Sequence, residues 1–428
     1  MIIVISVIHD RSLFMKPSFL VATFFFLQVQ VGSAILSDKI VSMLINPWEY
    51  FFVIHGYSVI ALVSSLMFYR RMYRGSFSRI VGRVITKREI VPRVLYIILP
   101  ALLIAAWYLS VVQISNTGLY ASIFKPELAD YAREESFAAL DAPVLKYGYY
   151  VMSVVLAPMS AIMMSLLIST SSNGAGIAWR IFAVSSILFL IVLVSLYGAR
   201  GPSAMLVISV LYAAYLQRGA PFNLARIALM FCLVLAVPAI ISMFKNAEYF
   251  TWTEYGRAFV NIIDRVFIRG AVPNIWHIDY IQENGFWGIS GIPKLAAIVG
   301  EDIVNVANLI SLEYDRRSLP YGVANAAYIT QYYSFFGILG GILSLAGVLA
   351  LDLVIHLYRF FRPVVLVPVV GALIIPFANL SFSQISTILL SKGLLVILLV
   401  GLLLQKAPIV RIRTTTNSTL TPLRNFMK

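Results

Sequence analysis

The chain has 428 residues, of which 60% are hydrophobic and only 12% are charged, and its formal net charge at pH 7 is +14. A mean hydropathy of +0.87 and recurring long apolar runs exclude a soluble globular domain and predict a polytopic membrane protein. The single cysteine, Cys232, excludes an internal disulfide, a zinc cluster and CxxC redox chemistry. We expect one integral membrane domain over residues 1–428, beginning without a cleavable signal peptide.

Apolar segments of the length that crosses a bilayer, about 20 residues, predict ten helices along the chain. We expect them at residues 13–36, 48–69, 94–115, 147–169, 178–198, 203–217, 226–244, 326–356, 363–380 and 386–404. The sixth is short, and the eighth is long enough to project from the membrane. The expected fold class is therefore an all-α bundle of about ten spans.

Basic residues gather on one side of this predicted topology. Segment 70–93, the basic loop, holds eight Lys or Arg residues and one Glu. With this loop and both termini in the cytoplasm, the cytoplasmic segments carry 20 basic residues, and the short exterior connections carry five, Lys39, Lys125, Arg133, Lys146 and Arg200. This excess of basic residues on the cytoplasmic side follows the positive-inside rule of membrane proteins. Membrane topology and attraction to lipid headgroups therefore explain most of the net positive charge, and no nucleic-acid partner is expected.

Two exterior segments are long enough to carry function, 116–146 and 245–325, which we call the first and the large loop. In the large loop, apolar residues at helical spacing predict an amphipathic helix from Thr253 to Ile268, ended by Pro273. Arg265 and Arg269, four residues apart, would share one face of it. A second periodic segment, 292–312, predicts a buried stripe of Leu295, Ile298, Val299, Ile303, Val306 and Ile310.

Five arginines of the large loop suggest an anion site, because guanidinium stays charged and binds phosphate oxygens in a bidentate fork. They are Arg257, Arg265, Arg269, Arg316 and Arg317. The alternative is that they pair with Glu254, Asp264, Asp315 or lipid headgroups and only anchor the loop. Aromatic residues of the loop suit sugar stacking, and they suit an interfacial belt as well; they are Trp276, Tyr280, Trp287 and Tyr321.

His277 is the only histidine of the large loop and lies two residues from Asp279. A histidine there can take a proton from a hydroxyl nucleophile. The alternative is an ordinary polar surface group.

Charged residues within or next to spans are the remaining candidates. Arg200, in "YGARGPSAM", lies at the turn between the fifth and sixth spans, where it either points into a cavity or snorkels to headgroups. We expect Asp352 to pair with Arg359 or to lie at the interface, and Lys392 to contact a lipid phosphate or to snorkel. No carboxylate falls at the membrane midplane, which disfavours ion-coupled transport. The absence of a DxD motif and of a His/Cys cluster disfavours a metal site, and no cofactor is expected.

Three short stretches carry a family resemblance. "YGARGPS" at 197–203, "RVFIRGAVPNIWHIDYIQ" at 265–282 and "NAAYITQYYSFFGILGGIL" at 325–343 resemble parts of the Wzy-type O-antigen polymerases. Some members of that family carry an Arg-x10-Gly pattern in exterior loops, and Arg257, Arg265 and Arg269 lack a glycine at that spacing.

The resemblance implies a GT-C-like membrane enzyme of the bacterial inner membrane with two periplasmic loops. Such enzymes join undecaprenyl-pyrophosphate-linked oligosaccharide repeat units, and a chain-length regulator is a possible partner. The resemblance implies that three arginines bind the pyrophosphate, namely Arg200, Arg265 and Arg269. Further candidates are Arg257, Arg316 and Arg317. We expect His277 to act as the base, with Asp279 orienting or replacing it, and Trp276, Tyr280 and Tyr321 to contact sugar.

Two other functions stay open. An O-antigen ligase-like enzyme shares the lipid-linked donor but transfers the glycan to another acceptor. A flippase or other transporter of lipid-linked glycans would need a central polar pathway and pseudo-symmetric halves, which the sequence lacks.

Overall fold

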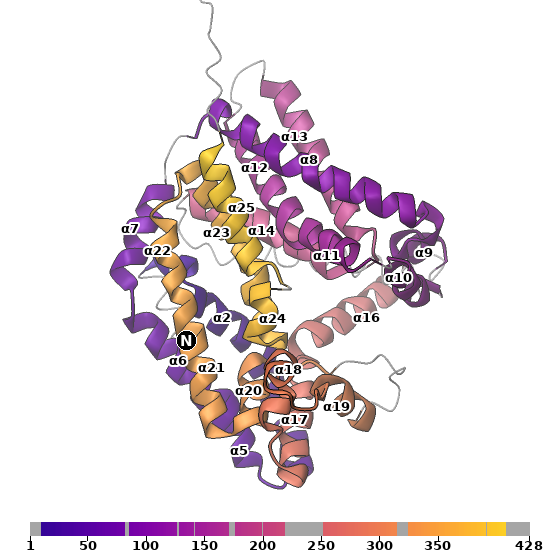
Figure 1. The fold of residues 1–428 in the computed structure, drawn as a ribbon, viewed down its shortest axis with the longest axis vertical. Coiled ribbons are helices and arrows are strands. Elements are labelled where there is room, and N and C mark those ends of the chain that lie inside the picture. Colours follow the sequence, from indigo (N-terminus) through magenta and orange to yellow (C-terminus); the bar gives the residue numbers. More distant parts are fainter. Residues whose placement is uncertain are drawn as a thin grey trace, which may run out of the picture.

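A computed structural model describes residues 10–81, 85–125, 128–140, 142–170, 176–198, 200–218, 251–314, 324–390 and 392–407. Every regular element in these ranges is a helix, as Figure 1 shows. The all-α class predicted from the sequence is therefore confirmed for the described part of the chain.

Eight helical segments in the described ranges are long and apolar enough to cross a membrane, which confirms a polytopic membrane protein. They are Pro17–Ile35 (α2, η2, α3), Pro47–Met67 (α5, η3, α6), Lys87–Val111 (α8), Pro143–Ser169 (α11, η6, α12), Ile177–Ser195 (within α13, Gly176–Ser195), Ile338–Tyr358 (α21, η9, α22), Pro363–Phe382 (α23, η10) and Thr387–Lys406 (α24, α25). The predicted sixth span corresponds to the shorter α14, Arg200–Arg218. The predicted seventh, 226–244, lies outside the described residues.

Helices α23 (Pro363–Asn379) and α12 (Ala157–Ser169) form the centre of the bundle. About 94% of the span that contains α23 and 83% of the span that contains α12 are buried, against 28% for α8 and 22% for α13. The exposed side chains of α8 are apolar, as in Leu95, Leu99 and Leu103. An apolar surface of this kind fits lipid, so α8 and α13 lie at the bundle's lipid-facing side.

The basic segment lies on one side of the bundle, away from the two loops. The basic α7 (Arg70–Ile80) is on the left in Figure 1, and α8 then carries the chain across to α9 (Gly118–Phe124) and α10 (Ala129–Ala138) on the right. The large loop begins there with α16 (Trp252–Ile263) and continues below with α17 (Val272–Asn284), η8 (Gly288–Gly291), α18 (Pro293–Val299) and α19 (Val306–Tyr314). The remaining connecting helices are η1 (Arg11–Met15), α4 (Ser37–Met43) and η4 (Ile114–Asn116).

Two predicted spans are interrupted by glycines with positive φ. The eighth was expected to be continuous over 326–356, but Gly337 (φ +58°) separates α20 (Tyr328–Phe336) from α21 (Ile338–Leu351). The tenth is divided by Gly393 (φ +82°) into α24 (Ile385–Leu390) and α25 (Leu394–Lys406). Glycine adopts such a conformation without strain, so a glycine at each position permits the break. Because of the break at Gly337, α20 is separate from the span and packs against α17 of the large loop.

The predicted helix 292–312 is likewise wrong as a single element. Gly300 (φ +79°) ends α18, and an extended segment precedes α19. Since α18 and α19 are separate helices, the residues of the predicted stripe do not lie on one face. Val306 and Ile310 are buried, whereas Leu295, Ile298, Val299 and Ile303 are exposed.

Four helices of the described chain contain a π turn: η2 (Phe26–Gln30), η3 (Phe52–Gly56), η6 (Met152–Leu156) and η7 (Asp264–Ile268). Such turns are rare and gather at functional sites. The turn η2 of the first span contacts both η3 and η7. Three irregular turns therefore meet where the large loop joins the outer half of the first two spans.

Candidate functional site

A polar pocket of about 210 Å3 lies where the large loop meets α20 and the segment before α24. One part of its lining is apolar and comes from Ile292, Pro293, Val304 and Phe335. Its polar side chains are those of His277, Asn305, Asn325, Gln331, Ser383, Gln384 and Thr387. No described residue with a charged side chain lines it, so the pocket offers hydrogen bonds without a net charge.

His277 is 1% exposed, and its Nε2–H donates to the carbonyl oxygen of Ala324 at 3.1 Å. With the proton on Nε2, the lone pair is on Nδ1, which has no hydrogen-bond partner among the described residues. Burial lowers the pKa of His277 to about 4, although the Ala324 carbonyl acts in the opposite direction. The imidazole is therefore neutral at pH 7, and its Nδ1 is a buried acceptor without a partner among the described residues.

Asn274 fixes the helix that carries His277. Its Nδ2 donates to the Gly270 carbonyl at 2.8 Å, and its Oδ1 accepts from the Ala327 N–H at 2.9 Å and from Thr330 Oγ1 at 2.7 Å. The side chain is fully buried and joins α17 to the start of α20. The sequence analysis missed this residue, although its i, i+3 spacing to His277 places both on the face toward α20.

Asp279 does not contact His277. Residues two apart on an α-helix do not face each other, and the Asp279 carboxylate is hydrogen-bonded to Tyr314 instead. Burial raises the pKa of Asp279, the hydrogen bond from Tyr314 lowers it, and Glu283 raises it further. In this geometry the hydrogen-bond partner of His277 is the Ala324 carbonyl rather than Asp279, and a role of Asp279 as the base stays a prediction.

The predicted aromatic contacts are largely occupied by one another. Trp276 stacks on Tyr314, with ring centroids 5.9 Å apart, and Tyr280 stacks on Trp287 at 4.9 Å. These pairs pack on the side of α17 that carries Asp279 and contribute to a small apolar cluster under the loop. Trp276 and Tyr280 therefore each have one ring face covered, while Tyr321 lies outside the described residues.

Two of the predicted phosphate ligands are paired with carboxylates on the surface. Arg257 Nη1 lies 2.7 Å from Glu254, and Arg269 Nε lies 2.5 Å from Asp264. Both guanidinium groups are more than half exposed, so these pairs are weak and exchangeable. Arg316 and Arg317 lie outside the described residues, as do the side chains of Arg200 and Arg265, whose backbones belong to α14 and η7.

The π turn changes the expected register of the two central arginines. The spacing of four predicted that Arg265 and Arg269 share a helix face. In η7 the Arg269 N–H donates instead to the Asp264 carbonyl, five residues back, at 2.8 Å. The Arg269 side chain follows the same relation and reaches Asp264.

Gly270, which follows the arginine turn η7 by two residues, packs against the residue that precedes the pocket lining. A Cβ on Gly270 would lie 2.4 Å from the Gln28 carbonyl oxygen and 3.1 Å from the Phe382 ring. Phe382 directly precedes Ser383 and Gln384, which line the pocket. A Cβ on Gly32 would lie 2.4 Å from the Phe267 carbonyl oxygen, so η7 also rests against the outer part of the first span.

Lys392 lies beside the same region, at the break of the last span. Its Nζ donates to Tyr150 Oη at 2.6 Å, and its backbone N–H donates to the carbonyl of Thr387, a pocket residue, at 3.0 Å. Neither lipid contact nor snorkelling, the two expected roles, accounts for this internal partner.

The first loop packs onto the turn that carries Arg200. The Leu119 N–H donates to the Leu196 carbonyl at 3.1 Å, and a Cβ on Gly118 would lie 2.4 Å from the Tyr197 carbonyl oxygen. The backbone around Arg200 is therefore held by the first loop.

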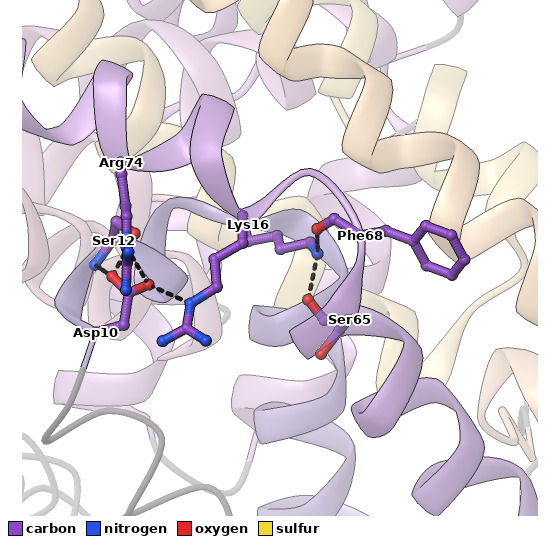
Figure 2. Close-up of polar contacts among 7 residues, drawn as sticks. Asp10, Ser12, Lys16, Ser65, Phe68 and Arg74 are labelled. Atoms are coloured by element: carbon purple, nitrogen blue, oxygen red, sulfur yellow. Dashed lines mark hydrogen bonds and ion pairs between the residues drawn. The ribbon is translucent and has the colours of Figure 1, made fainter.

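A second buried polar cluster lies near the basic loop, away from the pocket. Asp352 was expected to pair with Arg359, but its carboxylate lies 3.4 Å from Lys16 Nζ, and both side chains are fully buried. Ser18 donates to the same carboxylate through its N–H at 2.8 Å and through its hydroxyl at 2.7 Å. The Lys16 ammonium also donates to the carbonyls of Ser65 and Phe68, as Figure 2 shows.

Asp10 closes this cluster on the side of the basic loop. Its carboxylate accepts from Arg70 at 2.7 Å, from Arg74 at 2.8 Å and from the Ser12 hydroxyl at 2.6 Å (Figure 2). The sequence analysis did not single out Lys16 or Asp10 as partners, because the residues that meet here are far apart along the chain.

No group of three or more His, Cys, Asp or Glu side chains within the described ranges is arranged to hold a metal ion. No family model, no curated protein and no solved structure matches the chain. Its function therefore has to be argued from the pocket and the residues around it.

Proposed function

We propose that this protein is a glycosyltransferase that joins lipid-pyrophosphate-linked oligosaccharide repeat units at the outer face of the bacterial inner membrane. The observation that carries the proposal is the closeness of the His277 pocket to the arginine turn η7, through the contact of Gly270 with Phe382, which precedes the lining residue Ser383. One site holds a neutral base and hydrogen-bonding groups, and the other presents exchangeable cations beside the first span.

The proposed reaction uses both sites. A hydroxyl of the acceptor glycan attacks the anomeric carbon of the donor chain, forming a new glycosidic bond. The bond from that carbon to the pyrophosphate oxygen breaks, and its electron pair leaves with the lipid pyrophosphate. The hydroxyl proton passes to Nδ1 of His277 and then to the leaving pyrophosphate or to water. Arginines of the large loop, with Arg200, balance the charge that develops on the pyrophosphate.

The cation site fits a lipid-linked donor. A pyrophosphate on a membrane lipid lies at headgroup depth, and η7 packs against the outer part of the first span. The pairs Arg269–Asp264 and Arg257–Glu254 are exposed, so the pyrophosphate can displace the carboxylates at small energetic cost.

The test is chain elongation in a strain that lacks this gene and is complemented by variants. We expect the wild type to restore a polysaccharide ladder, and Arg265→Ala and Arg269→Ala to abolish long chains at normal protein levels. Arg71→Ala, an exposed arginine of α7, is the matched control and should give a normal ladder. Normal ladders in both loop variants would overturn the assignment.

The same strain separates the alternatives. Loss of a polymerase leaves single repeats on the surface, whereas loss of a ligase leaves none. Elongation by purified protein from lipid-linked repeats would exclude a transporter.

A further inference from the structure

We infer that the His277 pocket binds one uncharged sugar ring, the terminal residue of the acceptor glycan. The inference rests on the proposed function and adds the chemical class of sugar that the site accepts. Its first support is size: about 210 Å3 is less than the roughly 300–1,000 Å3 of sites for drug-sized ligands. Such a volume suits a single sugar ring.

The charge of the lining decides between neutral and acidic sugars. The polar groups that line the pocket are amides, hydroxyls and a neutral imidazole, and no described lining residue is a cation. The carboxylate of a uronic acid would lose its hydration there without gaining a counter-charge, which is unfavourable. The described lining residues give a pyrophosphate no counter-charge either, so we place the pyrophosphate at the arginine turn.

The two-sided lining fits a sugar ring as well. Phe335, Ile292 and Pro293 offer an apolar surface to the C–H face of a ring. Asn325, Gln331 and Thr387 offer donors and acceptors to hydroxyl groups. Gln331 is pre-positioned, because it is 5% exposed and its Nε2 donates to the Ala326 carbonyl at 2.6 Å.

His277 gives the bound ring an orientation. His277 lines the pocket, and its buried Nδ1 has no partner in the described part of the chain, so a small rotation of the ring on ligand binding would let a ligand hydroxyl donate to it. The hydroxyl that makes this bond is the one that the base can deprotonate. The pocket therefore selects which hydroxyl attacks, and with it the linkage of the polymer.

Binding can be tested without turnover. Purified protein in nanodiscs is titrated with the methyl glycosides of neutral hexoses, 6-deoxyhexoses and N-acetylhexosamines, with methyl glucuronide and with inorganic pyrophosphate. We expect at least one neutral glycoside to bind, and Asn325→Ala and Thr387→Val to weaken it by about fivefold each, the loss of one hydrogen bond. Asn284→Ala, an exposed amide on α17 outside the pocket lining, is the matched control and should leave binding unchanged.

Three outcomes would overturn the inference: no binding by any neutral glycoside, equal binding by the pocket variants, or preferential binding of glucuronide. A kinetic arm separates it from the proposed function. In the elongation reaction, Asn325→Ala should raise KM for the acceptor and leave kcat within about twofold, whereas His277→Ala should lower kcat. Elongation with unchanged acceptor KM in the pocket variants would overturn the pocket alone, and glycoside binding without any elongation would overturn the polymerase alone.

Discussion

The chain buries two polar clusters, and they differ in what they leave unpaired. Around Lys16 and Asp352 the ammonium has three partners and the carboxylate has partners on both oxygens. In the pocket, His277 Nδ1 has none among the described residues. A network in which every polar group is paired stabilises the packing of helices. An unpaired buried acceptor in a residue that lines a cavity is a candidate for hydrogen bonding to a ligand. We therefore assign architecture to the first cluster and chemistry to the second.

The largest expected effect is on catalysis. Removing a positioned base typically costs about 10²- to 10⁴-fold in rate, so His277→Ala should abolish detectable elongation. The variant also loses the hydrogen bond to the Ala324 carbonyl, so some loss of melting temperature is expected and the rate is measured on purified, folded protein. The measurement is the elongation rate with purified protein. A variant with more than about one tenth of wild-type rate would remove His277 from the mechanism.

The ion pair should behave in the opposite way. Lys16→Met leaves Asp352 as a buried charge without its counter-ion, which typically costs about 3–5 kcal/mol. We expect low protein levels and a lower melting temperature in the single variant. The double variant Lys16→Met with Asp352→Leu removes both charges and should recover much of the stability. Equal stability of all three proteins would contradict an architectural role.

Asn274 joins the two kinds of behaviour, because it is fully satisfied but supports the base. Asn274→Ala deletes three hydrogen bonds and leaves the Gly270 carbonyl and the Ala327 N–H without their partner. We expect a loss of about 2–3 kcal/mol in stability and a lower kcat from a misplaced His277. Asn274→Asp keeps the acceptor toward Ala327 and Thr330, so partial rescue of kcat would indicate positioning.

Acid pH should distinguish the two clusters as well. The folded-state pKa of His277 is about 4, below its ordinary value of 6.5, so the unfolded chain binds the proton more readily between these values. Stability is therefore complete above pH 6.5 and falls by about 3 kcal/mol as pH drops to 4. His277→Gln removes this contribution, and its melting temperature should fall less between pH 7 and pH 5 than that of the wild type. Parallel curves would refute the buried neutral histidine.

The smallest expected effect concerns the surface pairs. Arg257→Ala removes an exposed contact with Glu254 and should change stability by less than about 1 kcal/mol. Any larger loss of elongation in this variant would therefore report phosphate binding rather than folding. Glu254→Ala is the matched variant, since it removes the same pair and leaves the arginine.

Sequence periodicity predicted the spans well because lipid imposes the same demand on every segment that crosses it. All eight candidate spans overlap a predicted one over most of their length, but the eighth expected span started too early, because Gly337 separates α20 from the span that begins at Ile338. A glycine inside an apolar run does not reveal whether its φ is positive, so the breaks at Gly337 and Gly393 could not be predicted. The π turn η7 could not be predicted either. Its hydrogen bonds join residues five apart, and the sequence does not distinguish this pattern from the usual α-helical bonds between residues four apart.

The site was only partly predictable. His277 was selected because it is alone in a polar loop, a local feature. Gln331 and Thr387 reach the same pocket from α20 and α24, and no local pattern joins them to His277. Asp279 was predicted to contact His277 because the two residues are close in sequence. On a helix, however, residues two apart point to different faces.

The buried lysine also has a consequence for the order of biogenesis. Lys16 emerges with the first span, while Asp352, which follows Ser18 by 334 residues, emerges with one of the last. At about 5–20 residues per second, translation separates the two by tens of seconds. During that interval the ammonium has no counter-ion, and its available partners are the carbonyl oxygens of Ser65 and Phe68, which emerge with the second span. The first two spans can therefore pair early, and the charge of Lys16 is neutralised only when the chain is nearly complete.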